Sequence, residues 1–251
     1  MEWESPALVI AVKPYGEADS IVSAFTASYG RRAGWVPGGQ SRRLAGMWQK
    51  GNLLKLRWHG REPEGLGRFS AELAHPSAAL ALHSPDALAI VNALCAVADG
   101  TLPEREPQPA IFAALLPVLA GLHDPFGAIS ALVRWEVALL AALGYGMDLS
   151  CCAITGAAFG LTHVSPRTGR AVTRDAAANW AHRLLPLPKF LLPGTNAAPE
   201  AGDLADGLAL TAHFLARDVF GARHFPLPLA RVTLYERVLL HSQGTHSDHA
   251  G

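Results

Sequence analysis

One segment of the chain combines dense positive charge with a complete lack of acidic residues. Between Asp19 and Glu62 there are eight basic side chains and no Asp or Glu. Clustered Lys and Arg neutralise phosphate groups, and aromatic faces beside them can stack on unpaired bases. The eight are Arg31, Arg32, Arg42, Arg43, Lys50, Lys55, Arg57 and Arg61, with Trp35, Trp48 and Trp58 interleaved. The pattern predicts a nucleic-acid-binding surface.

Each part of this pattern also has a simpler interpretation. The arginines and lysines can form an ordinary solvated face, and the tryptophans can belong to the core. Trp58 falls on the apolar side of an alternating segment together with Leu54 and Leu56. For the tryptophans the core interpretation is favoured, whereas for the basic residues the binding interpretation is favoured.

The cysteines and histidines do not form a recognisable site. A structural zinc site needs two C-x2-C pairs or their His equivalents, and here Thr155 stands where Cys152 would need a second cysteine. A metal-dependent enzyme would have to use Cys151, Cys152 and His163. The P-loop, nucleophile-elbow, H-E-x-x-H and G-x-G-x-x-G patterns are all missing from the sequence. We therefore expect no catalytic residue, no metal and no cofactor.

The composition is that of a globular protein with an uneven charge distribution. Of the 251 residues, 50% are hydrophobic and 17% charged, and the formal net charge is zero. Residues 1–61 carry nine Lys/Arg against four Asp/Glu, so the remainder is acidic. Three cysteines indicate a reducing compartment. Without a signal peptide or a long enough apolar run, we expect a cytoplasmic, nucleoid-associated protein with no membrane contact.

The first 75 residues have the pattern of short strands separated by Gly-rich turns. The expected strands are 7–12, 21–25, 31–36, 53–58 and 66–73. Five such strands predict a small β-barrel. The number of strands fits both the OB-fold and an SH3-like barrel and does not distinguish between them.

After Pro76 the sequence becomes rich in Ala and Leu with helical spacing. Helices are expected from Pro85, near 110–122, from Pro125 to about Gly144, near 203–220 and near 228–241. The fold class is therefore α+β, a barrel followed by an all-helical domain. The predicted domains are 1–76 and 77–241, with an irregular insertion near 147–200 and a disordered tail at 242–251.

The order of several short motifs resembles that of the RecO family of recombination mediators. In the first half the matching segments are Pro14–Asp19, Phe25–Thr26, Tyr29–Arg31, Gly38–Arg43 and Gln49–Asn52. In the second half they are Arg134–Glu136, Leu139–Gly146, Cys152–Gly156, Val164–Val172 and Leu185–Pro188. The resemblance runs from about residue 1 to 192.

This resemblance implies an N-terminal OB-fold and a helical domain, which in some members holds a four-cysteine zinc module. Only Cys152 has a counterpart among those cysteines, so metal binding is not carried over. The family binds single- and double-stranded DNA and anneals complementary strands. With RecR it helps to load recombinase onto DNA coated by single-stranded-DNA-binding protein (SSB).

Matching positions imply that Arg31, Arg42 and Arg43 contact DNA, and Arg134 is a weaker candidate for binding the acidic-apolar SSB tail. The favoured function is therefore a non-enzymatic DNA-repair and recombination mediator of the RecF pathway. The first alternative is a protein-interaction module with an incidentally basic barrel, which would not bind single-stranded DNA at low salt. The metal-dependent enzyme is the last alternative.

Overall fold

The computed structural model describes residues 1–62, 65–195 and 198–247. The chain forms two compact units, Met1–His123 and Asp124–Gly251. Each unit is described by itself below.

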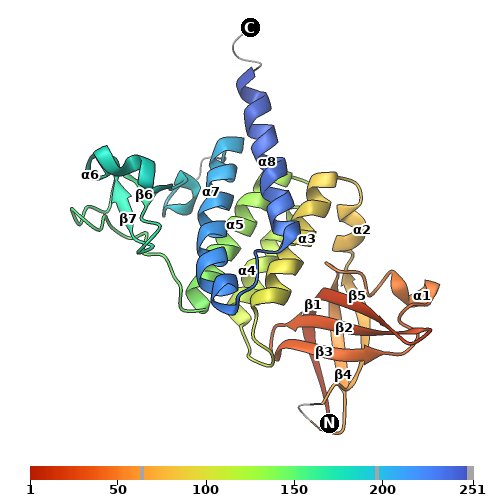
Figure 1. The fold of residues 1–251 in the computed structure, drawn as a ribbon. Coiled ribbons are helices and arrows are strands. Elements are labelled where there is room, and N and C mark those ends of the chain that lie inside the picture. Colours follow the sequence, from red (N-terminus) through yellow and green to blue (C-terminus); the bar gives the residue numbers. More distant parts are fainter. Residues whose placement is uncertain (63–64, 196–197, 248–251) are drawn as a thin grey trace. The chain divides into compact units, whose positions relative to one another are not determined.

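Five strands of the first unit close into a ring, which we call the β-ring (Figure 1). They are β1 (Glu2–Tyr15), β2 (Asp19–Thr26), β3 (Gly30–Val36), β4 (Leu53–His59) and β5 (Arg68–His75). Their order is β1-β2-β3-β5-β4, and β1 pairs with β4. The ring closes through one parallel pair, Trp35 with Arg68. Each of the five predicted strands overlaps an observed one, while the OB-fold itself stays a prediction.

Alternation along the strands produces the core of the β-ring. In β4 the side chains of Leu54, Leu56 and Trp58 are buried, whereas those of Lys55 and Arg57 are exposed. This is the predicted period of two for a strand with one buried face. Buried residues of all five strands and Trp48 complete the core.

The first unit also contains helices, and the two longest of them pack directly on the β-ring. The helices are α1 (Arg42–Ala45), α2 (Ser77–Ala81), α3 (Pro85–Thr101) and α4 (Pro109–Ala120). Ser84 caps α3 and Pro85 opens it, as predicted. Cys95 of α3 donates to the Val9 carbonyl at 3.6 Å, and Phe112 of α4 packs edge-on against Phe25. This unit extends beyond residue 76, and 1–76 as a separate domain stays a prediction.

The second unit is built on α5 (Pro125–Ala142), α7 (Ala201–Phe214) and α8 (Leu229–Ser247). Helix α7 packs against both of the others. A π-helical turn, Leu215–Phe220, follows α7 directly. Both C-terminal helices were predicted, but α8 continues through Ser247, beyond Ser242, where the disordered tail was expected to begin. Residues 248–251 of that tail lie outside the described residues.

We expected an all-helical C-terminal domain, and this expectation is corrected because the second unit contains a small sheet. Strands β6 (Leu161–Val164), β7 (Ala171–Thr173) and β8 (Leu185–Pro186) form it in the order β7-β6-β8, next to the short helix α6 (Arg174–Ala177). These strands lie inside the segment 147–200, which was expected to be irregular. Strands of two to four residues are too short for alternation to be recognisable in the sequence.

Among the described residues, α5 is long and apolar enough to cross a membrane by length and composition only. Half of its apolar window is buried within the structure. The helix also packs against α7 and carries the fully buried Glu136, as a core helix does. It is therefore weak evidence for a membrane span.

Candidate nucleic-acid interface

The segment between β3 and β4, residues 37–52, contains α1 and is held firmly against the β1–β2 hairpin. We call it the β3–β4 connection. The amide nitrogen of Gln40 donates to the Asp19 carbonyl at 2.7 Å, and the Asp19 carboxylate accepts from the backbone N–H of Gly38 at 2.8 Å. The same carboxylate accepts from the Trp35 indole at 2.9 Å. Figure 1 shows α1 beside the tip of this hairpin.

The far end of the connection is fixed by Asn52, whose side chain is buried. Its amide nitrogen donates to the carbonyls of Gly46 and Met47 at 2.9 and 3.0 Å, and its amide oxygen accepts from the Ala78 N–H at 3.0 Å. The preceding Gly51 has φ +97°, and a Cβ there would lie 2.3 Å from Val91. The connection is thus held in position by residues of the motifs named above: Asp19, Gln40 and Asn52 through hydrogen bonds, and Gly51 through its close packing.

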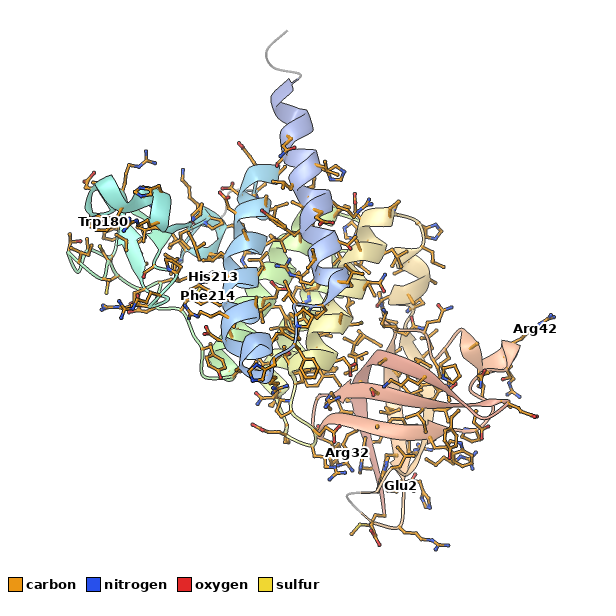
Figure 2. The ribbon with its side chains drawn as sticks, in the orientation of Figure 1. Glu2, Arg32, Arg42, Trp180, His213 and Phe214 are labelled. Carbon is orange, nitrogen blue, oxygen red and sulfur yellow. The ribbon has the colours of Figure 1, made fainter. Side chains whose placement is uncertain are left out.

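Three of the predicted basic residues lie on this connection and face solvent. Arg42, Arg43 and Lys50 are exposed, and Arg42 points outward from α1 (Figure 2). In the part of the chain that the structure describes, none of the three forms an ion pair with a carboxylate. Their charges therefore remain available to an anionic ligand.

Arg31 is engaged within the first unit. Its guanidinium lies 3.4 Å from Asp99 and 3.1 Å from Glu104, and its Nε donates to the Leu102 carbonyl at 3.0 Å. Its side chain is only 23% exposed. The structure thus places Arg31 in a contact between β3 and the end of α3.

Lys55 and Arg57 point outward from β4 but face two carboxylates of β1. Lys55 lies 3.1 Å from Glu4, and Arg57 lies 2.9 Å from Glu4 and 3.4 Å from Glu2. Hydrogen bonds from Lys55 and then Arg57 lower the pKa of Glu4, and the Glu4 hydrogen bond raises the pKa of Arg57. This face of the β-ring is close to neutral.

The remaining two basic residues lie elsewhere on the β-ring. Arg32 has the same strand parity as the buried Gly34 and Val36, so it points toward the ring interior. Its guanidinium carbon lies 5.7 and 5.6 Å from the ring centroids of Trp3 and Trp58. Arg61 is exposed just after β4. The eight basic residues therefore do not form one continuous surface.

Two of the three interleaved tryptophans, Trp48 and Trp58, belong to the core, which was the favoured interpretation. Trp58 and Trp48 are 1% and 2% exposed, stacked against Trp3 and Phe69 respectively. Trp35 is half-buried, with its indole N–H bonded to Asp19. Neither Trp58 nor Trp48 presents an open face on which a base could stack, whereas Trp35 has the outward parity of β3, together with the exposed Ala33.

Arg134, the candidate for binding an acidic tail, lies on α5 in the second unit. It is exposed, but its Nη2 donates to the Phe190 carbonyl at 2.8 Å and its guanidinium lies 5.4 Å from the Phe190 ring centroid. The guanidinium is therefore oriented by Phe190, and its remaining N–H groups can still meet a carboxylate.

Cys152 occupies a turn whose backbone amides point at its sulfur. Burial raises its pKa, but hydrogen bonds from Thr155 and from the backbone of Thr155, Thr173 and Ile154 lower it to about 6. Cys152 is 1% exposed, and its sulfur lies 3.6 Å from the Thr173 hydroxyl. Within residues 1–62, 65–195 and 198–247 no three His, Cys, Asp or Glu residues gather as metal ligands.

A five-stranded ring whose β3–β4 connection carries cations with no carboxylate partner among the described residues, followed by a mainly helical unit, defines an α+β protein. Comparison with known proteins agrees with this class. Residues 1–77 match the family described as Recombination protein O N terminal, and residues 82–224 match Recombination protein O C terminal. The chain belongs to the RecO family.

Relatives support this membership over nearly the full length. The DNA repair protein RecO of Acidiphilium cryptum is 53% identical over 241 residues, covering 95% of this chain and 96% of the relative. That of Granulibacter bethesdensis is 49% identical over 251 residues and covers 100% of both chains. That of Gluconacetobacter diazotrophicus is 51% identical over 247 residues, 95% of each. Membership supports a role in DNA repair and recombination.

Proposed function

We propose that this protein is a recombination mediator that binds single- and double-stranded DNA through the β3–β4 connection. The observation that carries the proposal is the position of Arg42, Arg43 and Lys50. All three are exposed and unpaired within the described residues, on a segment held by hydrogen bonds of the buried Asn52 side chain. A rigid cationic segment meets a phosphate backbone without first losing conformational freedom.

Annealing of complementary strands follows from the same surface. Two phosphate backbones repel each other, and a cationic surface that contacts both reduces this repulsion. Base pairing then supplies the driving force, so no bond-making residue is required of the protein. RecR and the SSB tail are the proposed partners during recombinase loading, and Arg134 beside Phe190 is the proposed contact for the acidic tail.

The matched test compares two double variants that each remove two positive charges. Arg42→Ala with Arg43→Ala removes unpaired charges, whereas Lys55→Ala with Arg57→Ala removes charges already paired with Glu4 and Glu2. Affinity is measured on unrelated single strands over a range of salt. We expect the first pair to weaken binding on every sequence and to reduce the salt slope by about 1 to 2, and the second pair to have a smaller effect. Equal effects would exclude the connection as the binding site.

The alternative, a protein-interaction module with an incidentally basic ring, is favoured by one observation. Arg31, Lys55 and Arg57 are already paired with carboxylates of the same unit. That alternative predicts no mobility shift of labelled single-stranded DNA even at low salt.

A further inference from the structure

A cleft of about 590 Å³ opens beside the β3–β4 connection. It lies between the β1–β2 hairpin, the connection and the last turns of α3, all within the first unit. Three other cavities of this unit are near 180 to 200 Å³. Only a cleft of the larger size falls in the range of small-molecule sites, which starts at about 300 Å³.

The lining of the cleft combines apolar residues with a smaller number of polar ones. Ile10, Val12 and Pro14 form one side, and Trp48 borders another. Gln40 and Gln49 provide amide groups. The amide nitrogen of Gln40 donates to two backbone carbonyls of the hairpin, so its amide oxygen remains as an acceptor for a ligand. The buried indole N–H of Trp48 has no hydrogen-bond partner among the described residues.

Cationic side chains border the cleft. Lys50 lines it, and Ala45, which also lines it, lies one helical turn after Arg42 in α1. The one carboxylate in the lining belongs to Asp99, which is paired with Arg31 at 3.4 Å. A ligand with a flat apolar body, polar edges and an attached negative charge matches this set of groups.

From these observations we infer that the cleft accepts one unpaired base of single-stranded DNA, while the neighbouring phosphates contact Arg42, Arg43 and Lys50. This inference rests on the proposed function and adds a ligand class to the same site. A paired base would first have to leave its stack and its partner, so the cleft favours single strands over duplex. Apolar contact with the base is tolerant of sequence.

The experiment compares two strands with the same phosphates but different bases. One is a short oligothymidylate, and the other is a strand of equal length in which every nucleoside is an abasic spacer. The unsubstituted full chain should bind the oligothymidylate about tenfold more tightly at equal salt, as expected for burial of one base. Ala96→Leu, on α3, should remove this preference by filling the cleft, with the salt slope unchanged because the phosphate contacts remain.

The matched control is Ala113→Leu, which adds the same side chain at an exposed position of α4 and should keep the preference. Equal affinity for the two strands, with Arg42→Ala and Arg43→Ala still weakening both, would overturn the cleft and leave the proposed DNA binding intact. If the cleft instead held a peptide or a second copy of the chain, the two strands would likewise bind with equal affinity. Failure of both strands to bind at low salt would overturn both proposals.

Discussion

A basic side chain contributes to DNA binding only if its charge is not already neutralised by the protein itself. Arg31 forms two ion pairs, with Asp99 and Glu104, and donates to the Leu102 carbonyl. Arg43 lies on α1, where the described residues offer it no carboxylate. The two arginines are therefore expected to differ in what their removal changes.

Replacing Arg31 by alanine should lower stability more than DNA affinity. The loss of a half-buried hydrogen bond and two partly exposed ion pairs is expected to reduce the free energy of unfolding by about 1 kcal/mol. Arg43→Ala should leave stability unchanged and weaken DNA binding. Urea unfolding and a DNA titration on both variants check this. A loss of affinity in Arg31→Ala as large as in Arg43→Ala would contradict it.

The faces of these side chains were partly predictable, but their partners were not. Strand parity separates Arg31 from Arg32 and groups Lys55 with Arg57, and that alternation was read correctly for β4. Glu2 and Glu4 are two residues apart and therefore lie on the same face of their strand. Only the pairing of β1 with β4, however, places Glu4 opposite Arg57. Asp99 and Glu104 are about 70 residues from Arg31 in sequence, and no local pattern connects them.

The low pKa of Cys152 predicts a pH-dependent stability. Its pKa is about 6 in the folded chain against an ordinary value of 9.0. The folded state therefore favours the thiolate, and this stabilisation is complete above pH 9 and disappears as pH falls through about 6. We expect Cys152→Ala to lower the melting temperature more at pH 8.5 than at pH 6. Cys151→Ala is the control, and a pH-independent effect of Cys152→Ala would count against this assignment.

At the scale of elements, a buried ion pair joins the three main helices of the second unit. Glu136 of α5 and Arg231 of α8 are both 0% exposed, and Arg231 Nε lies 2.6 Å from Glu136 Oε1. Thr211 of α7 donates to the same carboxylate. Arg231 also donates to the Leu208 carbonyl at 2.8 Å. The network fixes how α5, α7 and α8 pack.

Removing one member of this network should be more damaging than removing both charges. Arg231→Met leaves a buried carboxylate without its cation, and we expect a loss of about 3 to 5 kcal/mol of unfolding free energy. Combining it with Glu136→Leu should recover most of that loss, because the unpaired charge is then removed. Equilibrium denaturation of the single and double variants measures the difference. A double variant no more stable than Arg231→Met would show that the pair is stabilising in itself.

How well a helix or strand could be predicted depended on its length and on residues, such as proline, that mark where it begins. Helices α3 and α5 begin at Pro85 and Pro125, because proline at the first turn costs no hydrogen bond. The five ring strands are long enough, at seven residues or more, for their patterns to be recognised. The sheet β6–β8 was missed because its strands, of two to four residues, are too short for an alternation of buried and exposed residues to be recognised. The cleft beside the connection was also missed, since it depends on the packing of α3 against β1.

At the scale of the whole molecule, the charge asymmetry is local. Residues 1–61 are basic, but residues 1–123 carry eleven Lys/Arg and eleven Asp/Glu. The acidic residues that restore neutrality in the first unit include Asp99 and Glu104, which pair with Arg31. Long-range attraction of DNA to the first unit should therefore be weak, and binding should depend on the few unpaired cations.

The salt dependence of binding can count those cations. Each phosphate neutralised on a single strand contributes about −0.7 to the slope of log K against log salt. If only Arg42, Arg43 and Lys50 contact phosphates, the slope should be about −2, whereas all eight predicted residues would give about −6. A titration of the full chain with oligothymidylate over several salt concentrations measures this slope. A value near −6 would mean that the paired residues Arg31, Lys55 and Arg57 exchange their carboxylates for phosphates when DNA binds.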